Sequence, residues 1–461
     1  MPQPFALTAQ EMADAFGGVL HHGPAARPLP TVSIDTRTLA PGDLFVAIRG
    51  PRFDGHAFVA EAISRGAGAV AVSDVGALTS TLVPAIVVTD TLHGLQAAAH
   101  VIRRRAATSV VAITGSAGKT TTKEIAATLL GRRFTTFRNR GNLNNHLGLP
   151  LSLFELHTAP QMAVVELGMS GFGEISRLVA IAEPQVRVWT NVGEAHLGAF
   201  ASVEEIAQAK AEILEGATAD DVFVANAGDP RVMARVGAFP GQVITFGVDV
   251  AADVAIAQAR PQGFHGTTAT LSLRGDAHAI ETRLLGTPNL ANIAAASAVA
   301  FHAGVPARDI VEAIGGLSPA AHRGEILRAP GEWVVIDDAY NSSPTALTLA
   351  LETLVGTSGR HVAVLGEMLE LGHASEQYHV ACGQAAARLG VELLIAVGGA
   401  PARALADAAR EAGVDAVHAG DSVAGASLAR ERVRQGDVVL VKGSRGIGME
   451  VVVQALMEGA R

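Results

Sequence analysis

The chain lacks several features that mark particular classes of protein. Cys382 is the only cysteine among 461 residues, which excludes an intramolecular disulfide framework and is typical of a reducing compartment. No apolar stretch reaches the ~20 residues that cross a bilayer, and the N-terminus has no basic start followed by an apolar run. The net charge of −9, without long charged runs, disfavours nucleic-acid binding. We expect a soluble, cytoplasmic protein with no nucleic-acid partner and no integral membrane segment.

Aromatic residues are also scarce, at 4% of the chain, although 49% of the residues are hydrophobic. The core must therefore be built from Ala, Val, Leu and Ile, which suit buried parallel strands covered by helices. At about 150 residues per domain, the length predicts roughly three domains. The expected fold class is α/β in three domains.

Strand and helix patterns divide the chain into blocks at 1–90, 91–317 and 318–461. The first block reads as a small α/β domain. The second alternates strands with helices, which predicts a central, mostly parallel sheet with helices on both faces. Alternating polar and apolar residues around Gly275-Asp276 predict an antiparallel hairpin at its edge. The third block reads as a Rossmann-like α/β domain whose strands end in polar or glycine-rich loops, where open α/β sheets bind ligands.

The stretch ITGSAGKTTTKE (113–124) follows a predicted strand and opens a predicted helix. Its backbone N–H groups and helix dipole suit phosphate oxygens, with Lys119 to neutralise phosphate charge and Thr120 to hold Mg²⁺. The common P-loop has a further glycine where this chain has Ile113, so the loop is a short variant. A chance glycine turn is the alternative, but the strand–loop–helix setting favours nucleotide binding.

Other polar residues follow the next strands of the central block. Glu166 ends the predicted strand 162–167, and His196 follows the predicted strand 186–191. Each alone is more often a solvated or structural residue. Together with the loop they fall on one edge of the predicted sheet, which favours a metal and phosphate site. Lys210 lies on a predicted helix over 201–216, and spacing alone favours an exposed lysine there.

In the third block, the loop WVVIDDAYNSSPTAL groups Asp337, Asp338, Tyr340 and Asn341 between a strand and a helix. Such residues often cap the next helix, but two acids, a tyrosine and an asparagine also suit a polar ligand. In VKGSRGIGME (441–450), Lys442 and Arg445 are either ligand contacts or surface charges. The residues alone leave that undecided.

The motifs, taken in order, resemble those of the Mur ligases, and the match covers almost the whole chain. The stretches that carry it are SIDTRTLAPGDLFVAIRGPRFDGHAF (33–58), TGSAGKTTTKE, GNLNNHLGLP (141–150), ELGMSGFGEI (166–175), TNVGEAHLGAF (190–200), AKAEIL (209–214), LLGTPNLANIAAA (284–296), DDAYNSSPTAL (337–347), LGEMLELG (365–372) and VKGSRG (441–446). The family has three domains: an N-terminal one for the UDP-sugar, a central one for ATP, and a C-terminal one that receives the incoming amine and closes on ATP.

The resemblance implies a site for ATP and two Mg²⁺ ions, with Lys119, Glu166, His196 and Lys210 as catalytic residues. It implies that CO₂ converts Lys210 to a carbamate, an anionic oxygen ligand. The implied metal ligands are Thr120, Glu166, His196 and carbamylated Lys210. The implied ATP-binding residues are Gly115, Ser116, Ala117, Gly118, Lys119, Thr120, Thr121, Asn289, Asn292, Arg323 and Asp338.

The implied substrates are UDP-N-acetylmuramoyl-tripeptide and D-alanyl-D-alanine, joined through an acyl phosphate by a monomeric enzyme of peptidoglycan synthesis. The loops DDAYNSSP and LGEMLELG favour this dipeptide over the single amino acid that a sister ligase adds. The implied substrate-binding residues are Ser33, Asp35, Thr36, Arg37, Asn142, Asn144, Asn145, Tyr340, Asn341, Lys442 and Ser444.

Three alternatives stay open at this point. One is the sister ligase, and another is a folylpolyglutamate synthase, which shares the ATP module but is disfavoured by the N-terminal block. The third is a nucleotide-binding regulatory protein that uses the loop as a switch. The general base that accepts the amine proton has no obvious candidate.

Overall fold

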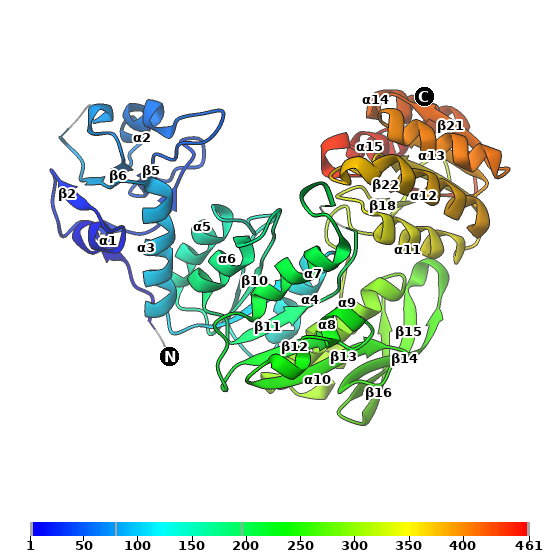
Figure 1. The fold of residues 1–461 in the computed structure, drawn as a ribbon, viewed down its shortest axis with the longest axis horizontal. Helices are drawn as coiled ribbons and strands as arrows, with labels where there is room; N and C mark the ends of the chain where they lie inside the picture. The colour runs from blue at the N-terminus through cyan, green and yellow to red at the C-terminus, as the bar shows by residue number, and fades with distance from the viewer. Residues whose placement is uncertain (1–2, 79–80, 195–196, 459–461) are drawn as a thin grey trace. The chain divides into compact units, whose positions relative to one another are not determined.

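A computed structural model describes residues 3–78, 81–194 and 197–458, drawn in Figure 1. The chain forms two compact units whose segments interleave along the sequence. Unit 1 comprises Met1–Ile113, Arg133–Arg187 and Glu212–Asp221; unit 2 comprises Thr114–Arg132, Val188–Ala211 and Val222–Arg461. The domain boundaries near residues 90 and 317 stay a prediction.

Unit 1 begins with a small α/β sheet. Its strand order is β2-β7-β6-β5-β4, and β4 to β7 pair in parallel whereas β2 pairs antiparallel with β7. The strands are β2 (Val19–His21), β4 (Val32–Ser33), β5 (Leu44–Val46), β6 (Ala69–Val72) and β7 (Ala85–Val87). Helix α2 (Val59–Ser64) packs its apolar side on this sheet. Beside the sheet, β1 (Leu7–Thr8) pairs with β3 (Pro28–Leu29), and Thr8 and Glu11 form a capping box on α1 (Ala9–Ala15).

A fifteen-residue helix, α3 (Thr91–Arg105), leads from this small sheet to the next part of unit 1. Asp90 caps its first turn by accepting from the His93 N–H at 2.9 Å. In its last turn Arg103 is buried and donates to the Ala182 carbonyl at 2.6 Å. Burial lowers the Arg103 pKa, and the carbonyl offsets part of the desolvation cost.

The remainder of unit 1 holds the start of the largest sheet. Here the strand order is β11-β8-β10-β9, and β10 pairs in parallel with both β8 and β9. The strands are β8 (Ser109–Thr114), β9 (Thr136–Arg138), β10 (Met162–Glu166) and β11 (Val186–Trp189). The helices of this part are α5 (Gly148–Phe154) and α6 (Glu174–Ala182).

Unit 2 contains the rest of that sheet, in the order β16-β15-β14-β13-β12-β11. Its strands are β12 (Val222–Asn226), β13 (Gln242–Val248), β14 (Val254–Pro261), β15 (Thr267–Leu273) and β16 (Asp276–Thr282). Strands β15 and β16 pair antiparallel around the turn at Arg274-Gly275, so the predicted edge hairpin is confirmed. The helices are α4 (Lys119–Leu130), α7 (Val203–Ala211), α8 (Pro230–Met233), α9 (Thr287–His302) and α10 (Ala307–Gly315).

The C-terminal part of unit 2 is a six-stranded sheet in the order β17-β18-β22-β19-β20-β21. All neighbours pair in parallel except β17 with β18. The strands are β17 (Glu325–Arg328), β18 (Val334–Asp338), β19 (Arg360–Gly366), β20 (Leu393–Val397), β21 (Asp415–Ala419) and β22 (Asp437–Lys442). This is the expected Rossmann-like arrangement.

Helices cover both faces of this sheet. One face packs on α11 (Pro344–Val355), α12 (Ser375–Leu389) and α13 (Ala400–Glu411), and the other on α14 (Ser422–Arg432) and α15 (Glu450–Met457) (Figure 1). Strand β22 continues into α15, whereas its neighbours β18 and β19 continue into helices of the opposite face. The connections therefore diverge on both sides of the carboxyl end of β22, which is where open α/β sheets bind ligands.

The predicted fold class is confirmed: the sheets are mixed but mostly parallel and are covered by helices. Across the three described ranges, no helix has the length and apolar character needed to cross a membrane.

Candidate functional site

The glycine loop lies in unit 2, between the end of β8 and the start of α4. Gly115 and Gly118 have φ values of 151° and 81°, which L side chains rarely adopt. A Cβ on Gly115 would lie 1.9 Å from Thr190 Oγ1, and one on Gly118 would lie 2.3 Å from Asn292 Oδ1. Both positions therefore require glycine. Helix α4 starts directly at Lys119, so its first N–H groups face the loop, the geometry that binds phosphate.

Side chains that follow β11 hold the loop in this shape. The Ala117 N–H donates to Asn191 Oδ1 at 2.8 Å, and the Thr190 hydroxyl donates to the Ala117 carbonyl at 2.6 Å. Ser116 Oγ donates to the Gly193 carbonyl at 3.1 Å and accepts from the Gly193 N–H at 2.9 Å. Bonds within the protein thus fix the positions of Ser116 and Ala117.

Two lysine side chains meet at one carbonyl oxygen of the loop. The Gly115 carbonyl accepts from Lys119 Nζ at 2.9 Å and from Lys210 Nζ at 3.1 Å. Lys210 extends from α7 and is only 1% exposed, so the exposed position that helical spacing favoured for it is wrong. Two ammonium groups beside the positive end of α4 make this a strongly anion-attracting point.

Asn289 and Asn292 of α9 brace the loop from the other side. Asn292 Oδ1 accepts from the Thr122 hydroxyl of α4 at 3.1 Å and lies against Gly118. The Asn292 amide also reaches Asn289 Oδ1 at 3.4 Å, and Asn289 Nδ2 donates to the Leu285 carbonyl at 2.8 Å. The pair links α9 to the first turn of α4, next to the predicted ATP-binding residues Thr120 and Thr121.

Glu166 lies in unit 1, buried at the end of β10 and paired in register with Ile113 of β8. Its carboxylate accepts from Asn144 Nδ2 at 2.7 Å, and its N–H donates to Asn139 Oδ1 at 3.0 Å. Asn144 thus orients the carboxylate that the sequence predicted as a metal ligand. Asn139 is fully buried and was not identified from the sequence, because nothing in RNRGN shows that its amide pairs with a distant strand end.

Asn142 and Asn145, the other two predicted asparagines of this segment, do not contact Glu166 in the same way as Asn144. Asn145 Oδ1 accepts from the Gly148 N–H at 2.8 Å at the start of α5, and Asn142 is exposed. Their substrate contacts stay a prediction.

The predicted metal ligands belong to different parts of the structure. Glu166 is in unit 1, Thr120 and Lys210 are in unit 2, and His196 lies outside the described residues. Within the described part of the chain, no three His, Cys, Asp or Glu side chains form a metal-binding group. The magnesium set of Thr120, Glu166, His196 and carbamylated Lys210 stays a prediction.

At the carboxyl ends of β18 and β22, the predicted residues are tied to one another. Lys442 Nζ donates to Asp338 Oδ2 at 2.6 Å and to the Asn341 carbonyl at 2.9 Å. Ser444 Oγ accepts from the Leu369 N–H at 2.9 Å. Lys442 and Ser444 are both buried, so they join three strand-end loops instead of presenting polar atoms to solvent.

Two arginines approach the ring of Tyr340 at this edge. The Arg323 guanidinium carbon is 4.0 Å from the Tyr340 ring centroid, and that of Arg445 is 5.6 Å away. The sequence left Arg445 open as a ligand contact or a surface charge, because its pairing with an aromatic ring depends on the fold. Nearby, buried Asp337 Oδ2 is hydrogen-bonded to His322 Nδ1 at 2.7 Å, which fixes the end of β18 just before the Asp338–Asn341 loop.

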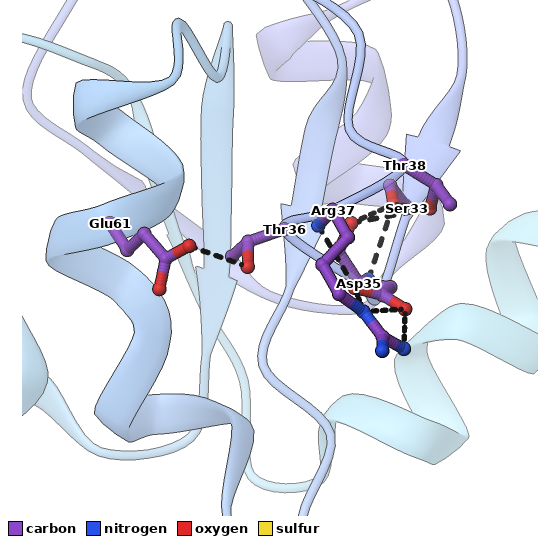
Figure 2. Close-up of polar contacts among 6 residues, drawn as sticks. All are labelled: Ser33, Asp35, Thr36, Arg37, Thr38 and Glu61. Atoms are coloured by element: carbon purple, nitrogen blue, oxygen red, sulfur yellow. Dashed lines mark hydrogen bonds and ion pairs between the residues drawn. The ribbon is translucent and has the colours of Figure 1, made fainter.

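The predicted residues of the N-terminal block make side-chain bonds in two separate groups, together called here the N-terminal network (Figure 2). Thr36 Oγ1 donates to Glu61 Oε1 of α2 at 3.0 Å, and Ser33 Oγ donates to the Asp35 carbonyl at 3.0 Å. Arg37 pairs with Asp35 at 2.6 Å, yet its side chain is 83% exposed. The turn therefore presents an exposed guanidinium held in place by its neighbour.

Hydrogen bonds from the Arg37 side chain and backbone lower the pKa of Asp35 to about 2. The ordinary value is 3.8, so the pairing is complete above that pH and is lost as the pH falls through about 2.

Three family models match the chain in order. The Mur ligase family catalytic domain matches residues 29–128, the Mur ligase middle domain 113–300, and the Mur ligase glutamate ligase domain 322–445. The UDP-N-acetylmuramoyl-tripeptide–D-alanyl-D-alanine ligase of Bacillus subtilis is 34% identical, with 93% of each chain covered. That of Escherichia coli is 33% identical over 98% of each chain.

Two solved structures are similar to this chain over almost its whole length. A crystal structure of MurF from Acinetobacter baumannii has a TM-score of 0.90 and 32% identity, covering 99% of this chain and 100% of that one. The structure of MurF ligase from Thermotoga maritima in complex with ADP has a TM-score of 0.82 and 28% identity. The match covers 93% of this chain and 97% of that one.

Gly118→Ala is expected to weaken ATP binding roughly tenfold or more, because the added Cβ meets Asn292 and the left-handed backbone is strained. Isothermal titration calorimetry with a non-hydrolysable ATP analogue measures this. Gly237→Ala is the matched control, since its φ is not positive and a Cβ there meets nothing within 4 Å. Equal affinity for all three proteins would contradict the packing described for the loop.

Arg37→Gln is expected to move the Asp35 pKa upward from about 2 toward 3.8, because the largest cause of the shift is removed. Carboxyl-carbon NMR titration between pH 1.5 and about 5 follows this group. Arg52→Gln, an exposed arginine of the same unit, should leave the midpoint where it is. If the titration midpoint of Asp35 is unchanged in Arg37→Gln, Arg37 and Asp35 do not pair in solution.

Proposed function

The chain belongs to the Mur ligase family, and we propose that it is an ATP-dependent amide ligase that adds D-alanyl-D-alanine to UDP-N-acetylmuramoyl-tripeptide. The product would be the UDP-linked pentapeptide precursor of peptidoglycan. The observation that supports this most strongly is the extent of the match. Relatives that carry the name of this reaction are 33–34% identical over 93–98% of the chain, so the N-terminal network, the glycine loop and the C-terminal sheet are all included.

A carboxylate at neutral pH does not react with an amine, because it has no good leaving group. The reaction must therefore first convert the carboxylate to a derivative that has one. In the first step a carboxylate oxygen of the tripeptide attacks the γ-phosphorus of ATP. The bond between that phosphorus and the β–γ bridging oxygen breaks, giving ADP and an acyl phosphate. In the second step the amine of D-alanyl-D-alanine attacks the acyl carbon, loses a proton and expels inorganic phosphate.

The glycine loop addresses the first step, in which two anions must approach each other. The N–H groups at the start of α4 and the Lys119 ammonium would hold the β- and γ-phosphates and spread their charge. Lys119 already points at the loop, through its bond to the Gly115 carbonyl at 2.9 Å. Asn289, Asn292, Arg323 and Asp338 would bind the rest of ATP.

The donor set also fits Mg²⁺. Glu166 offers a buried carboxylate held by Asn144, Thr120 a hydroxyl, and Lys210 an amine that becomes an anionic oxygen ligand on reaction with CO₂. When bound, two Mg²⁺ ions would neutralise charge on the phosphoryl group and on the attacking carboxylate. With His196, these residues would hold the ions. The carbamate also removes one of the two positive charges that meet at the Gly115 carbonyl.

The tripeptide nucleotide is assigned to the N-terminal network of Ser33, Asp35, Thr36 and Arg37 and to the segment with Asn142, Asn144 and Asn145. The incoming dipeptide is assigned to the edge with Tyr340, Asn341, Lys442 and Ser444. In that edge Lys442 and Ser444 would shape the site by joining its loops. The monomeric state and the location in the cell stay predictions.

Purified protein is expected to release phosphate from ATP only when UDP-tripeptide and D-alanyl-D-alanine are both present. Coupled phosphate detection, with the pentapeptide product identified by mass spectrometry, measures this. Lys119→Ala should abolish turnover, because the phosphate charge loses its cation. Turnover with single amino acids instead would point to the sister reaction. ATP binding without any turnover would favour a nucleotide switch and sink the proposal.

Lys210→Ala is expected to lose nearly all activity and to regain part of it when short-chain carboxylates such as acetate are added. The carboxylate can occupy the space of the lost carbamate and supply the same kind of oxygen ligand. Lys119→Ala is the control, since its amine is not converted to a carbamate and carboxylates should not restore it. Equal failure of both variants to respond would contradict the carbamate at Lys210.

A further inference from the structure

The carboxyl end of β22 lies between diverging chain connections and carries two cationic side chains, Lys442 and Arg445. A third cation, Arg323, precedes β17 and approaches the same Tyr340 ring as Arg445. Lys442 is neutralised within the protein, because its ammonium group bonds to Asp338 Oδ2 at 2.6 Å and to the Asn341 carbonyl. It is 4% exposed and cannot easily reach a second anion. The two arginines are therefore the cations of this edge that a ligand can use.

The two guanidinium groups share a single aromatic ring, that of Tyr340, at 4.0 and 5.6 Å from its centroid. The ring attracts each cation, but the two like charges repel each other. Among the described residues, Arg323 makes no ion pair, and the one carboxylate near Arg445 is that of Glu450, at 3.7 Å. An Arg–carboxylate pair at that distance is too long for a good hydrogen bond. A bound anion would relieve the repulsion.

Arg445 is the more accessible of the two. Its side chain is 60% exposed, and it belongs to the loop between β22 and α15, where the chain connections diverge. Next to it, the apolar Leu369 lies over Gly446, whose Cβ would be 2.8 Å from Leu369 Cδ1. Leu369 is itself 39% exposed. The loop thus offers an arginine fork beside a small apolar surface.

D-alanyl-D-alanine has matching chemistry. Its amine is consumed in the reaction, but its carboxylate stays charged in substrate and product, and its two methyl groups are apolar. We propose that the Arg445 guanidinium binds the carboxylate of the incoming dipeptide, with Leu369 against its methyl groups. This assignment rests on the proposed function, and it identifies the residue that binds the terminal carboxylate of that substrate. Arginine suits the task because its fork matches a carboxylate with two parallel hydrogen bonds.

The test compares D-alanyl-D-alanine with its carboxamide, which keeps the amine and both methyl groups but has no charge at the end. In the wild-type protein the acid should have the higher kcat/KM. Arg445→Gln should raise KM for the acid by roughly tenfold to a hundredfold, the cost of losing a hydrogen bond to a charged group. The KM for ATP and for UDP-tripeptide should stay within about twofold, which is the ordinary scatter for an uninvolved residue. Acid and carboxamide should become nearly equal substrates.

Arg388→Gln is the matched control. Arg388 is an exposed arginine in the last turn of α12, away from the strand carboxyl ends, and its substitution should preserve the preference for the acid. Thermal unfolding of both variants checks that they fold. Arg445→Lys should keep part of the preference, because the charge remains but the fork is lost.

Each other outcome counts against the assignment. If Arg445→Gln still prefers the acid by the wild-type ratio, Arg445 does not bind the carboxylate. If instead its KM for ATP rises, the guanidinium serves the phosphates. If the wild-type protein does not turn over D-alanyl-D-alanine at all, the proposed function itself fails, which is a result distinct from the other two.

Discussion

The chemistry of the site depends on one shared acceptor, the Gly115 carbonyl. Lys119 and Lys210 both donate a hydrogen bond to it. They place the two ammonium nitrogens within about 6 Å of each other. At an effective dielectric constant of about 20, two unit charges at that separation repel by roughly 3 kcal/mol. The positive end of α4 adds to this cost. The loop therefore attracts a polyanion, and in the proposed reaction a carbamate at Lys210 would remove one of the two positive charges.

A second constraint governs the C-terminal sheet. Its strand-end loops are joined by bonds internal to the protein: Lys442 joins β22 to the Asp338–Asn341 loop, and Ser444 joins it to Leu369. Buried polar residues that satisfy one another in this way rigidify a site. Polar residues in a predicted binding loop thus divide into those that hold the loops and those that face the ligand. The residues that hold the loops are buried, whereas those that face the ligand are exposed. Arg445 is exposed and belongs to the residues that face the ligand.

Much of this was predictable from local patterns. The glycine loop between a strand and a helix, and the edge hairpin, follow from periodicity and turn residues, which act over short stretches of chain. The burial of Lys210 was not predictable, because α7 has no strongly one-sided pattern and its lysine packs against a loop 95 residues away. Asn139 and Asn144 at Glu166, and Arg445 at Tyr340, likewise depend on which loops meet. Such pairings are properties of the tertiary fold.

The central claim is that Lys210 acts as an anion at the loop when the site is loaded. Carbon-13 NMR of the protein in ¹³C-bicarbonate, with an ATP analogue and Mg²⁺ present, tests it directly. The account predicts a carbamate resonance that is absent from Lys210→Ala and present in Arg388→Gln. A spectrum with no resonance that depends on Lys210 would contradict the account.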